Sequence, residues 1–359
     1  MSPSLRFPEF NGEWKNTTLE ECVDFLDGQR KPIKSDDRKG EKRLYPYYGA
    51  SGIIDYIDEY IFDGDYILLS EDGANIIDRN YRVAFIANGK IWVNNHAHVL
   101  QPHKEMNINF LSEALERINY AIYNTGTTMP KLNQEICRKI NLNVPSLSEQ
   151  NKIGNLLYLL NERIATQNRL IEKLQSLIGG IAQHCIKEAI SGSMGIKLGD
   201  ICKITTGKLD ANAQVDNGLY PFFTCAEQPF KIDNFAFDTE ALLISGNGAN
   251  LGYVNYYNGK FNAYQRTYVL DAFSENIQYI KWALKVLLPK RIAIEKSSSN
   301  TPYIVLSTLS DLRLPIPSKG NQCHMAELMQ SLERKLSNQI ALKSSYNMLK
   351  QYLLRQMFI

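Results

Sequence analysis

A chain of 359 residues has room for two or three domains of ordinary size. Hydrophobic residues make up 44% of it and charged residues 22%, which is ordinary for a globular protein and excludes general disorder. The formal net charge of +2 neither favours nor excludes nucleic-acid binding, because such binding depends on local basic clusters.

The six cysteines are scattered and include no Cys-x-x-Cys pair. This spacing argues against a zinc site and against a disulfide framework, and it is typical of a reducing compartment. No stretch approaches the ~20 apolar residues that span a bilayer. The first residues lack the apolar run of a signal peptide. We therefore expect a soluble, cytoplasmic protein.

Residues 1–147 are predicted to form a β-rich globular domain. Runs rich in Ile, Tyr, Leu and Val at 53–57, 66–69 and 83–87 are typical of short strands between turns that carry Gly and Asp. The dipeptide Asn88-Gly89 is expected to be a hairpin turn, because both residues tolerate positive φ.

A different pattern begins at Ser148. Apolar residues from Ile153 to Ile181 alternate at steps of four and three, which is an a/d seam of about four heptads. Pro145 stops the preceding element, and Ser148 is a suitable N-cap. We predict a long helix over 148–190; at ~1.5 Å per residue, its stretch from 148 to 186 alone is roughly 58 Å long.

The remainder of the chain repeats the first part. The run Tyr-Pro-Tyr-Tyr at 45–48 returns as Tyr-Pro-Phe-Phe at 220–223, and Ser-x-x-Gly-Ala-Asn at 70–75 returns at 245–250. Because the displacement drifts by only a few residues across a half-chain, we infer two copies of one domain. Residues 191–318 are predicted to form the second β-rich domain, and 319–359 the second long helix.

Two helices with apolar stripes must bury them, and each other is the simplest partner. A compact domain intervenes between them, so we expect an antiparallel pair. Gln167 and Gln339 hold equivalent positions and would form one polar layer that sets the register; two solvent-touching glutamines are the alternative. The residues predicted to pair the helices are Leu160, Ile164, Gln167, Ile171, Leu332, Leu336, Gln339 and Leu342.

The predicted fold class is therefore α+β. Two β-rich globular domains are joined by two long antiparallel coiled-coil helices, and the whole carries a pseudo-twofold internal repeat.

The alternation of domain, long helix, domain and long helix resembles the specificity (S) subunit of type I restriction-modification systems. A Pro-x-x-x-Glu-Gln run opens the first helix, and the resemblance covers the whole chain. Similar blocks are Leu-Arg-Phe-Pro at 5–8, Tyr-Pro-Tyr-Tyr-Gly at 45–49, Trp-Val-Asn-Asn-His-Ala-His at 92–98 and Thr-Gly-Thr-Thr-Met-Pro-Lys-Leu at 125–132. The second copy departs from the pattern with Asn321 for the Glu and with Arg-Thr-Tyr at 266–268 for His-Ala-His.

This resemblance implies a non-catalytic reader of double-stranded DNA. Each globular domain would be a target-recognition domain for one half of a bipartite sequence. The helices would hold the halves apart and dock two modification (methyltransferase) subunits, with restriction subunits joining through the complex. No cofactor is expected in this chain; S-adenosylmethionine, ATP and Mg²⁺ would belong to the partner subunits.

Three other interpretations stay open at this point. One is a coiled-coil scaffold whose paired domains bind protein or another ligand. A weaker one is an enzyme with an unrecognised site. The third, a close variant of the leading interpretation, is the specificity subunit of a type IIB-like system. We find no amino-methyltransferase motif, nuclease cluster or Walker A lysine in the sequence.

Base reading needs side chains with paired donors and acceptors, which are Asn or Gln for adenine and Arg or Lys for guanine. Such residues follow the expected hairpin in both copies, although some of them would alternatively be strand residues satisfied internally. A metal site at His96-x-His98 is not predicted, because no third ligand stands at a recognisable spacing. The base-contact candidates are Asn94, Asn95, His96, His98, Gln265 and Arg266.

Hydroxyl groups and basic side chains make good phosphate partners, which position a protein without reading sequence. A polar loop at 126–131 and a second one at 296–301 occupy matching places, and a basic stretch begins at Gln29. Solvated loops with no partner are the alternative for all three. The DNA-backbone candidates are Arg30, Lys31, Lys34, Thr127, Thr128, Lys131, Lys296, Ser298 and Asn300.

Overall fold

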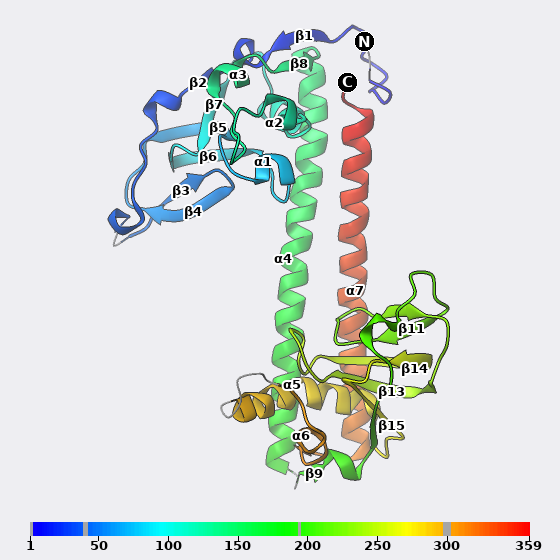
Figure 1. The fold of residues 1–359 in the computed structure, drawn as a ribbon. Helices are drawn as coiled ribbons and strands as arrows, with labels where there is room; N and C mark the ends of the chain where they lie inside the picture. The colour runs from blue at the N-terminus through cyan, green and yellow to red at the C-terminus, as the bar shows by residue number, and fades with distance from the viewer. Residues whose placement is uncertain (1–2, 39–41, 193–194, 297–302) are drawn as a thin grey trace. The chain divides into compact units, whose positions relative to one another are not determined.

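The computed structural model describes residues 3–38, 42–192, 195–296 and 303–359 (Figure 1). The chain forms two compact units: the first combines residues 1–168 with 341–359, and the second spans 169–340. Each unit contains one β-rich domain and a part of each long helix. The architecture is α+β, as predicted, whereas the division into four functional segments stays a prediction.

A six-stranded sheet forms the centre of the first domain. Its strands lie in the order β2-β7-β5-β6-β3-β4, with β3 parallel to β6 and the other neighbours antiparallel. A separate antiparallel pair joins β1 to β8. The strands are β1 Lys15–Thr18, β2 Val23–Phe25, β3 Tyr45–Gly49, β4 Gly52–Ile57, β5 Phe62–Ser70, β6 Ala84–Val93, β7 Ala97–Pro102 and β8 Asn141–Val144, and the short helices are α1 Asn75–Asp78, α2 Ile108–Glu116 and α3 Gln134–Arg138.

The second domain has the same topology. Its sheet has the order β10-β15-β13-β14-β11-β12, again with one parallel pair, β11 and β14, and the pair β9 and β16 corresponds to β1 and β8. The duplication inferred from the sequence is therefore present in the fold. The elements are β9 Ile196–Lys197, β10 Lys203–Thr206, β11 Tyr220–Phe223, β12 Phe230–Ile232, β13 Phe237–Ser245, β14 Val254–Ala263, β15 Thr267–Asp271, β16 Arg313–Leu314, α5 Ile277–Lys296 and α6 Leu306–Ser310.

The prediction of a hairpin turn at Asn88-Gly89 is wrong. Both residues lie inside β6, where Gly89 faces Gly64 of β5, and the equivalent Gly259 lies inside β14. Gly64, Gly89 and Gly259 all have positive φ, of 154°, 73° and 129°. The dipeptide therefore marks a glycine kink within a long strand pair, because glycine tolerates this backbone conformation without turning the chain. The turn itself follows at 94–96.

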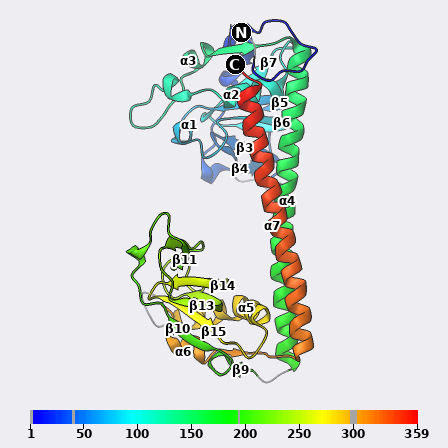
Figure 2. The same cartoon turned by 90° about the vertical axis from the view of Figure 1, so that its right-hand side faces the viewer.

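The long helices are α4, Leu147–Gly192, and α7, Lys319–Gln356. In the first unit, Leu157 of α4 shares a core with Leu353 of α7. In the second unit, Ala182 of α4 shares a core with Met329 of α7. The start of α4 thus packs against the end of α7, and the end of α4 against the start of α7, so the two helices are antiparallel (Figure 2).

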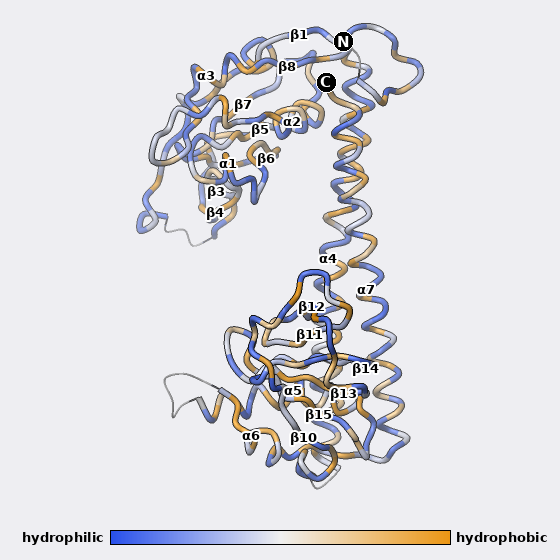
Figure 3. Tube along the Cα trace, turned by 45° about the vertical axis from the view of Figure 1, so that its right-hand side comes forward, coloured by the Kyte–Doolittle hydropathy of each residue, from blue (hydrophilic) through white to orange (hydrophobic). Residues whose placement is uncertain are grey.

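Apolar and polar residues alternate along both long helices (Figure 3). Among the predicted pairing residues, Leu160, Gln167 and Ile171 are buried, Ile164 packs against the first core, and Leu332 and Leu336 pack against the second. Leu342 is 39% exposed. A polar layer between Gln167 and Gln339 stays a prediction. Within the described ranges, no helix has both the length and the apolar character needed to cross a membrane.

The start of α4 is clamped to its domain by Gln150. The side-chain oxygen of Gln150 accepts a hydrogen bond from the N–H of Asn107, 2.9 Å away, and its amide donates to the carbonyl of Pro145 at 3.0 Å. Asn107 is also the N-cap of α2. The neighbouring Glu149 forms a bidentate ion pair with Arg6, with both N–O distances at 2.7 Å.

The start of α7 repeats the glutamine clamp without the ion pair. Gln322 accepts from the N–H of Asn276 at 3.0 Å and donates to the carbonyl of Pro317 at 3.0 Å. Asn321 stands where Glu149 stands in the first copy. The glutamine of the Pro-x-x-x-Glu-Gln run is thus the part that both copies need, because it joins two elements distant in sequence.

Candidate nucleic-acid interface

Several loops gather at one end of the first sheet. The N–H of Glu71 donates to the carbonyl of His96 at 2.9 Å, and the N–H of Leu132 donates to the carbonyl of Glu71 at 2.7 Å. The N–H of Gly73 donates to the carbonyl of Pro130 at 3.0 Å. These bonds join the β5–α1 loop, the β6–β7 turn and the loop before α3 into one surface.

The second domain makes equivalent bonds with different residues. The N–H of Gly246 donates to the carbonyl of Arg266 at 2.8 Å, and the N–H of Ile304 donates to the carbonyl of Gly246 at 2.9 Å. Gly246 therefore corresponds to Glu71, and Arg266 to His96. The equivalence is set by the backbone, so side chains at these places are free to differ between the copies.

Four of the six base-contact candidates are exposed: Asn95 and His96 at the β6–β7 turn, and Gln265 and Arg266 at the equivalent β14–β15 turn. We call these two turns the reading turns. Nδ1 of His96 lies 2.8 Å from a carboxylate oxygen of Asp72. The side chains of the other three have no hydrogen-bond partner within the part of the chain that the structure describes. Exposed, unengaged donors and acceptors at equivalent turns are what base reading requires.

Asn94 has a structural role at the start of the β6–β7 turn. Its side chain is 4% exposed, and its Oδ1 accepts from the N–H of His96 at 2.8 Å. Its own N–H donates to the carbonyl of Tyr48 at 3.1 Å. Since this side chain shapes the turn from inside, we remove Asn94 from the candidate readers.

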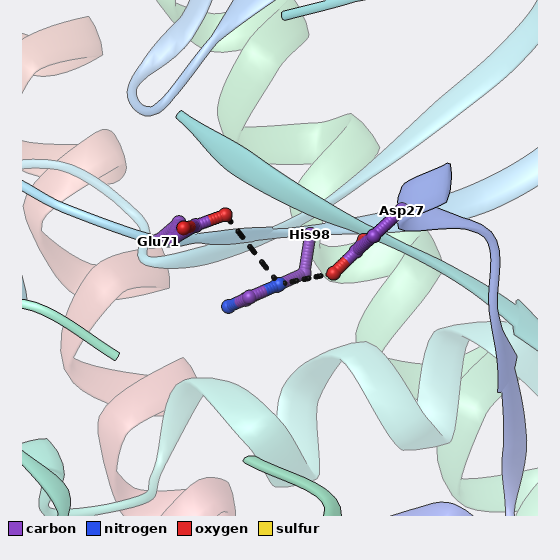
Figure 4. Close-up of side chains that lie close together, drawn as sticks. All are labelled: Asp27, Glu71 and His98. Carbon is purple, nitrogen blue, oxygen red and sulfur yellow. Dashed lines mark hydrogen bonds and ion pairs between the residues drawn. The ribbon is translucent and has the colours of Figure 1, made fainter. Parts of the chain in front are cut away.

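His98 is 1% exposed and both of its ring nitrogens are engaged. Figure 4 draws the contacts of one of them, with Asp27 and Glu71. Nδ1 lies 2.6 Å from Asp27, and Nε2 lies 2.9 Å from the carbonyl of Leu132. Because both partners accept only, both nitrogens carry a proton. Burial lowers the pKa of His98, but the bond to Asp27 and the neighbouring Cys137 outweigh it and raise the pKa to about 10. His98 is therefore a buried imidazolium and we remove it from the candidate readers.

Asp27, Glu71 and His98 place their ligand atoms within 4.8 Å of one another (Figure 4). Arg30 enters the same cluster: its guanidinium lies 2.7 Å from Glu71 and 3.5 Å from Asp27, and it donates to the carbonyl of Ala97 at 2.8 Å. Two cations thus balance two carboxylates, and we assign no metal here. Burial raises the pKa of Asp27, but the bond to His98 outweighs it and the net pKa is lowered. Arg30 points into the protein, so it leaves the set of phosphate contacts.

The second domain replaces the whole ionic cluster by neutral residues. Thr206 pairs with Tyr268 in the register of β10 and β15, and the Tyr268 hydroxyl donates to the carbonyl of Ile304 at 2.9 Å. Gly246 leaves space beside the Tyr268 ring, since a Cβ there would lie 3.2 Å from that ring and 2.4 Å from the carbonyl oxygen of Arg266. The difference between His98 and Tyr268 is thus a difference in packing.

Lys31 and Lys34 are exposed on a loop that is held against the first sheet. The indole N–H of Trp92 donates to the carbonyl of Lys31 at 2.6 Å, and the N–H of Ile33 donates to the Tyr47 hydroxyl at 2.9 Å. Anchoring of this kind fixes where the two ammonium groups can meet a phosphate, at a lower ordering cost than in a free loop.

Thr127 and Thr128 are exposed at the tip of the neighbouring loop. Asn124 closes this loop by accepting from the N–H groups of Gly126 and Lys131, at 2.9 and 2.8 Å. The ammonium of Lys131 lies 3.5 Å from Glu71. These residues stay candidates for phosphate contact on the same surface as Asn95.

The matching loop of the second copy is only partly described. Ser298 and Asn300 lie outside the described residues, and so does the side chain of Lys296, which ends α5. Sequence reasoning missed Lys208, which is exposed beside Leu209. The carbonyl of Leu209 accepts from the N–H of Gln265 at 2.9 Å, so Lys208 flanks the second reading turn. No sequence motif marks this lysine.

The family model of the type I restriction modification DNA specificity domain matches this chain twice, at residues 11–176 and 191–343. The chain belongs to this family. A similar protein is the EcoDI specificity subunit of Escherichia coli, 42% identical over 137 residues, which are 38% of this chain and 30% of the relative. Another relative, from Haemophilus influenzae, is 35% identical over 145 residues, or 40% of this chain and 36% of the relative. These two alignments span about a third of each relative.

Longer matches to the specificity family exist at lower identity. The MjaVIII specificity subunit of Methanocaldococcus jannaschii is 23% identical over 381 aligned residues, covering 92% of this chain and 87% of the relative. The crystal structure of an S subunit from M. genitalium has a TM-score of 0.76 at 20% identity and covers 100% of this chain and 99% of that one. The structural likeness confirms the fold.

Proposed function

We propose that this chain is the sequence-specificity subunit of a cytoplasmic type I restriction-modification complex and reads a bipartite DNA target. One observation carries the proposal: two domains of the same topology present equivalent turns whose exposed side chains differ. Asn95 and His96 stand at one turn and Gln265 and Arg266 at the other. Family membership supports the assignment to DNA.

In this proposal the chain is not itself catalytic. Methyl transfer and cleavage belong to modification and restriction subunits, which hold S-adenosylmethionine, ATP and Mg²⁺. Two modification subunits dock on α4 and α7. The contribution of this chain is binding energy that depends on sequence, supplied by base contacts at the two turns and by phosphate contacts that position them.

The spacer between the two half-sites is set by the long helices, because the separation of two reading heads dictates their reach along a duplex. Removing one heptad from each helix, residues 164–170 and 336–342, tests this. Each segment is centred on one of the equivalent glutamines and preserves the a/d seam. The deletion shortens each helix by ~10 Å, which corresponds to ~3 base pairs.

The measurement is mapping of methylated adenines in cells that express the variant with its partner subunits. The expected result is the same two half-sites with a spacer ~3 base pairs shorter. A matched control removes four residues from each helix, which rotates one domain against the other and should abolish methylation. An unchanged spacer in the heptad variant would contradict the proposed role of the helices.

A further inference from the structure

Besides the reading turns, the first domain carries an exposed aromatic and aliphatic cluster. The rings of Tyr45 and Tyr60 lie 5.1 Å apart, and the ammonium of Lys90 lies 4.6 Å from the ring of Tyr60. The preceding Leu44 is 58% exposed. Asp63 of β5 stands opposite Lys90 in the strand register.

The second domain carries the same cluster. The rings of Tyr220 and Phe235 also lie 5.1 Å apart, and the ammonium of Lys260 lies 4.6 Å from the ring of Phe235. Leu219 is 75% exposed, and Asp238 stands opposite Lys260. We call the two clusters the repeated patch.

The repeated patch and the reading turns both lie on the surface, but they differ in how similar their exposed side chains are between the two copies. At the turns the exposed side chains differ between the copies. In the patch they agree in type, geometry and exposure. A scattered exposed leucine is ordinary, but folding alone does not require Leu44 and Leu219 to stay exposed at equivalent positions. The agreement points to a surface that meets the same partner in both domains.

The charge of the repeated patch decides what kind of partner fits. Each copy holds one lysine and one aspartate beside its aliphatic and aromatic groups, so the shared part is close to neutral. Lys42 and Arg43 add positive charge beside the first copy only, since Asn217 and Gly218 stand in the second. DNA phosphates need a basic surface, whereas exposed leucine and aromatic rings suit the buried centre of a protein interface.

We propose that each copy of the repeated patch docks one modification subunit, so that the two identical subunits are held by equivalent surfaces on the domains as well as by the long helices. This inference rests on the proposed function, because the modification subunit is the partner named there. The inference adds a second contact for each subunit, made by the patch residues of one domain. The patch also gives each subunit a defined position beside the domain whose half-site it modifies.

The test uses the full chain with its methyltransferase subunit. The variants are Leu44→Glu, Leu219→Glu and the pair together; both side chains are exposed, so folding should be retained, and circular dichroism checks it. Native mass spectrometry and sedimentation count the bound subunits. Wild type should bind two, each single variant one at the same concentration, and the double variant none, with affinity for the altered copy at least about tenfold weaker. Duplex binding by the chain alone should be unchanged.

Leu159→Glu serves as the comparison on α4, where this leucine is exposed. If Leu159→Glu releases the subunits while the double patch variant still binds two, docking uses the helices alone and the repeated patch is not a docking surface. If wild type binds two subunits and every patch variant does so with unchanged affinity, the inference is overturned while the proposed function stands. If wild type binds none, the proposed function itself fails.

Discussion

The two domains support equivalent turns with different buried side chains, which are charged in the first domain and neutral in the second. Beneath the first reading turn, Asp27, Glu71, His98 and Arg30 form a charged cluster. Beneath the second, Tyr268 makes the equivalent bond to a backbone carbonyl without any charge. The difference teaches that variation between the copies has two sources: buried differences keep a shared backbone in place, and exposed differences at the same turn are free to read DNA.

The largest expected effect follows from breaking the charged cluster. In a His98→Phe variant Asp27 loses the nearer of its two cationic partners and keeps only Arg30, at 3.5 Å. Removal of one member of a buried pair costs about 3–5 kcal/mol. The first unit should therefore lose protection in hydrogen exchange, while the second keeps it. The matched change Tyr268→Phe should cost the second unit only about 1 kcal/mol. Equal losses in the two units would contradict the contrast between an ionic and a neutral solution.

The same cluster predicts a pH dependence confined to the first unit. The pKa of His98 is raised to about 10 in the folded protein. Because the pKa of this imidazole is higher in the folded chain than in the unfolded chain, where it is ~6.5, protonation favours the fold. The stabilisation is fully present below pH ~6.5 and is lost as pH rises through 10. Nitrogen NMR of labelled histidine at pH 8 should show His98 with both nitrogens protonated, and His98→Phe should remove that signal. A neutral His98 at pH 8 would refute the assignment.

The exposed residues of the first turn give the next effect in size. Replacing Asn95 and His96 together by alanine should relax one half-site, with a loss of about 1–3 kcal/mol of discrimination for each good base contact removed. Replacing Gln265 and Arg266 should do the same for the other half-site. Binding to duplexes altered in one half at a time measures both. Loss of specificity in both halves from either variant would mean that the domains do not read separately.

The glutamine clamps should behave alike in the two units. Gln150→Ala and Gln322→Ala each remove three side-chain hydrogen bonds at a helix start. Each variant leaves a backbone donor and acceptor unsatisfied, at about 1–3 kcal/mol. Hydrogen exchange of α2 and α5 reports each loss. Glu149→Asn places in the first copy the residue that the second copy has at Asn321. This variant removes the ion pair with Arg6 and leaves Gln150 unchanged, so it measures the ion pair apart from the clamp. A clear difference between the two glutamine variants would show that the clamps are not equivalent.

The smallest effect is expected from the anchored lysines. Changing Lys31 and Lys34 to glutamine should weaken duplex binding evenly across sequences and reduce the salt slope by up to ~0.9 for each phosphate that is no longer neutralised. The control changes Lys173 and Lys335, which are exposed on the long helices. Titration of binding at several salt concentrations compares the pairs. A change in base preference would mean that these lysines read sequence.

Sequence patterns were reliable where a signal is local or repeated. The heptad seam predicted both long helices because a 3.5-residue period has a single structural meaning over four heptads. The Asn-Gly dipeptides gave a wrong prediction of hairpin turns. They indicate only that the backbone can adopt positive φ, and this conformation occurs in a kink inside β6 as well as in a turn. The neighbouring Asn94 and His98 looked equivalent to Asn95 and His96, because burial is not visible in a short window of sequence.

By itself the sequence determined that one domain occurs twice with a long helix after each copy, since repetition at a nearly constant displacement needs no coordinates to be seen. Only the tertiary structure decided which of the differing residues are free to act. Asp27 and Glu71 come to His98 from 71 and 27 residues away along the chain, and Leu132 from 34. Such contacts depend on how the strands and loops come together, and they separate a buried imidazolium from the exposed His96 two residues earlier.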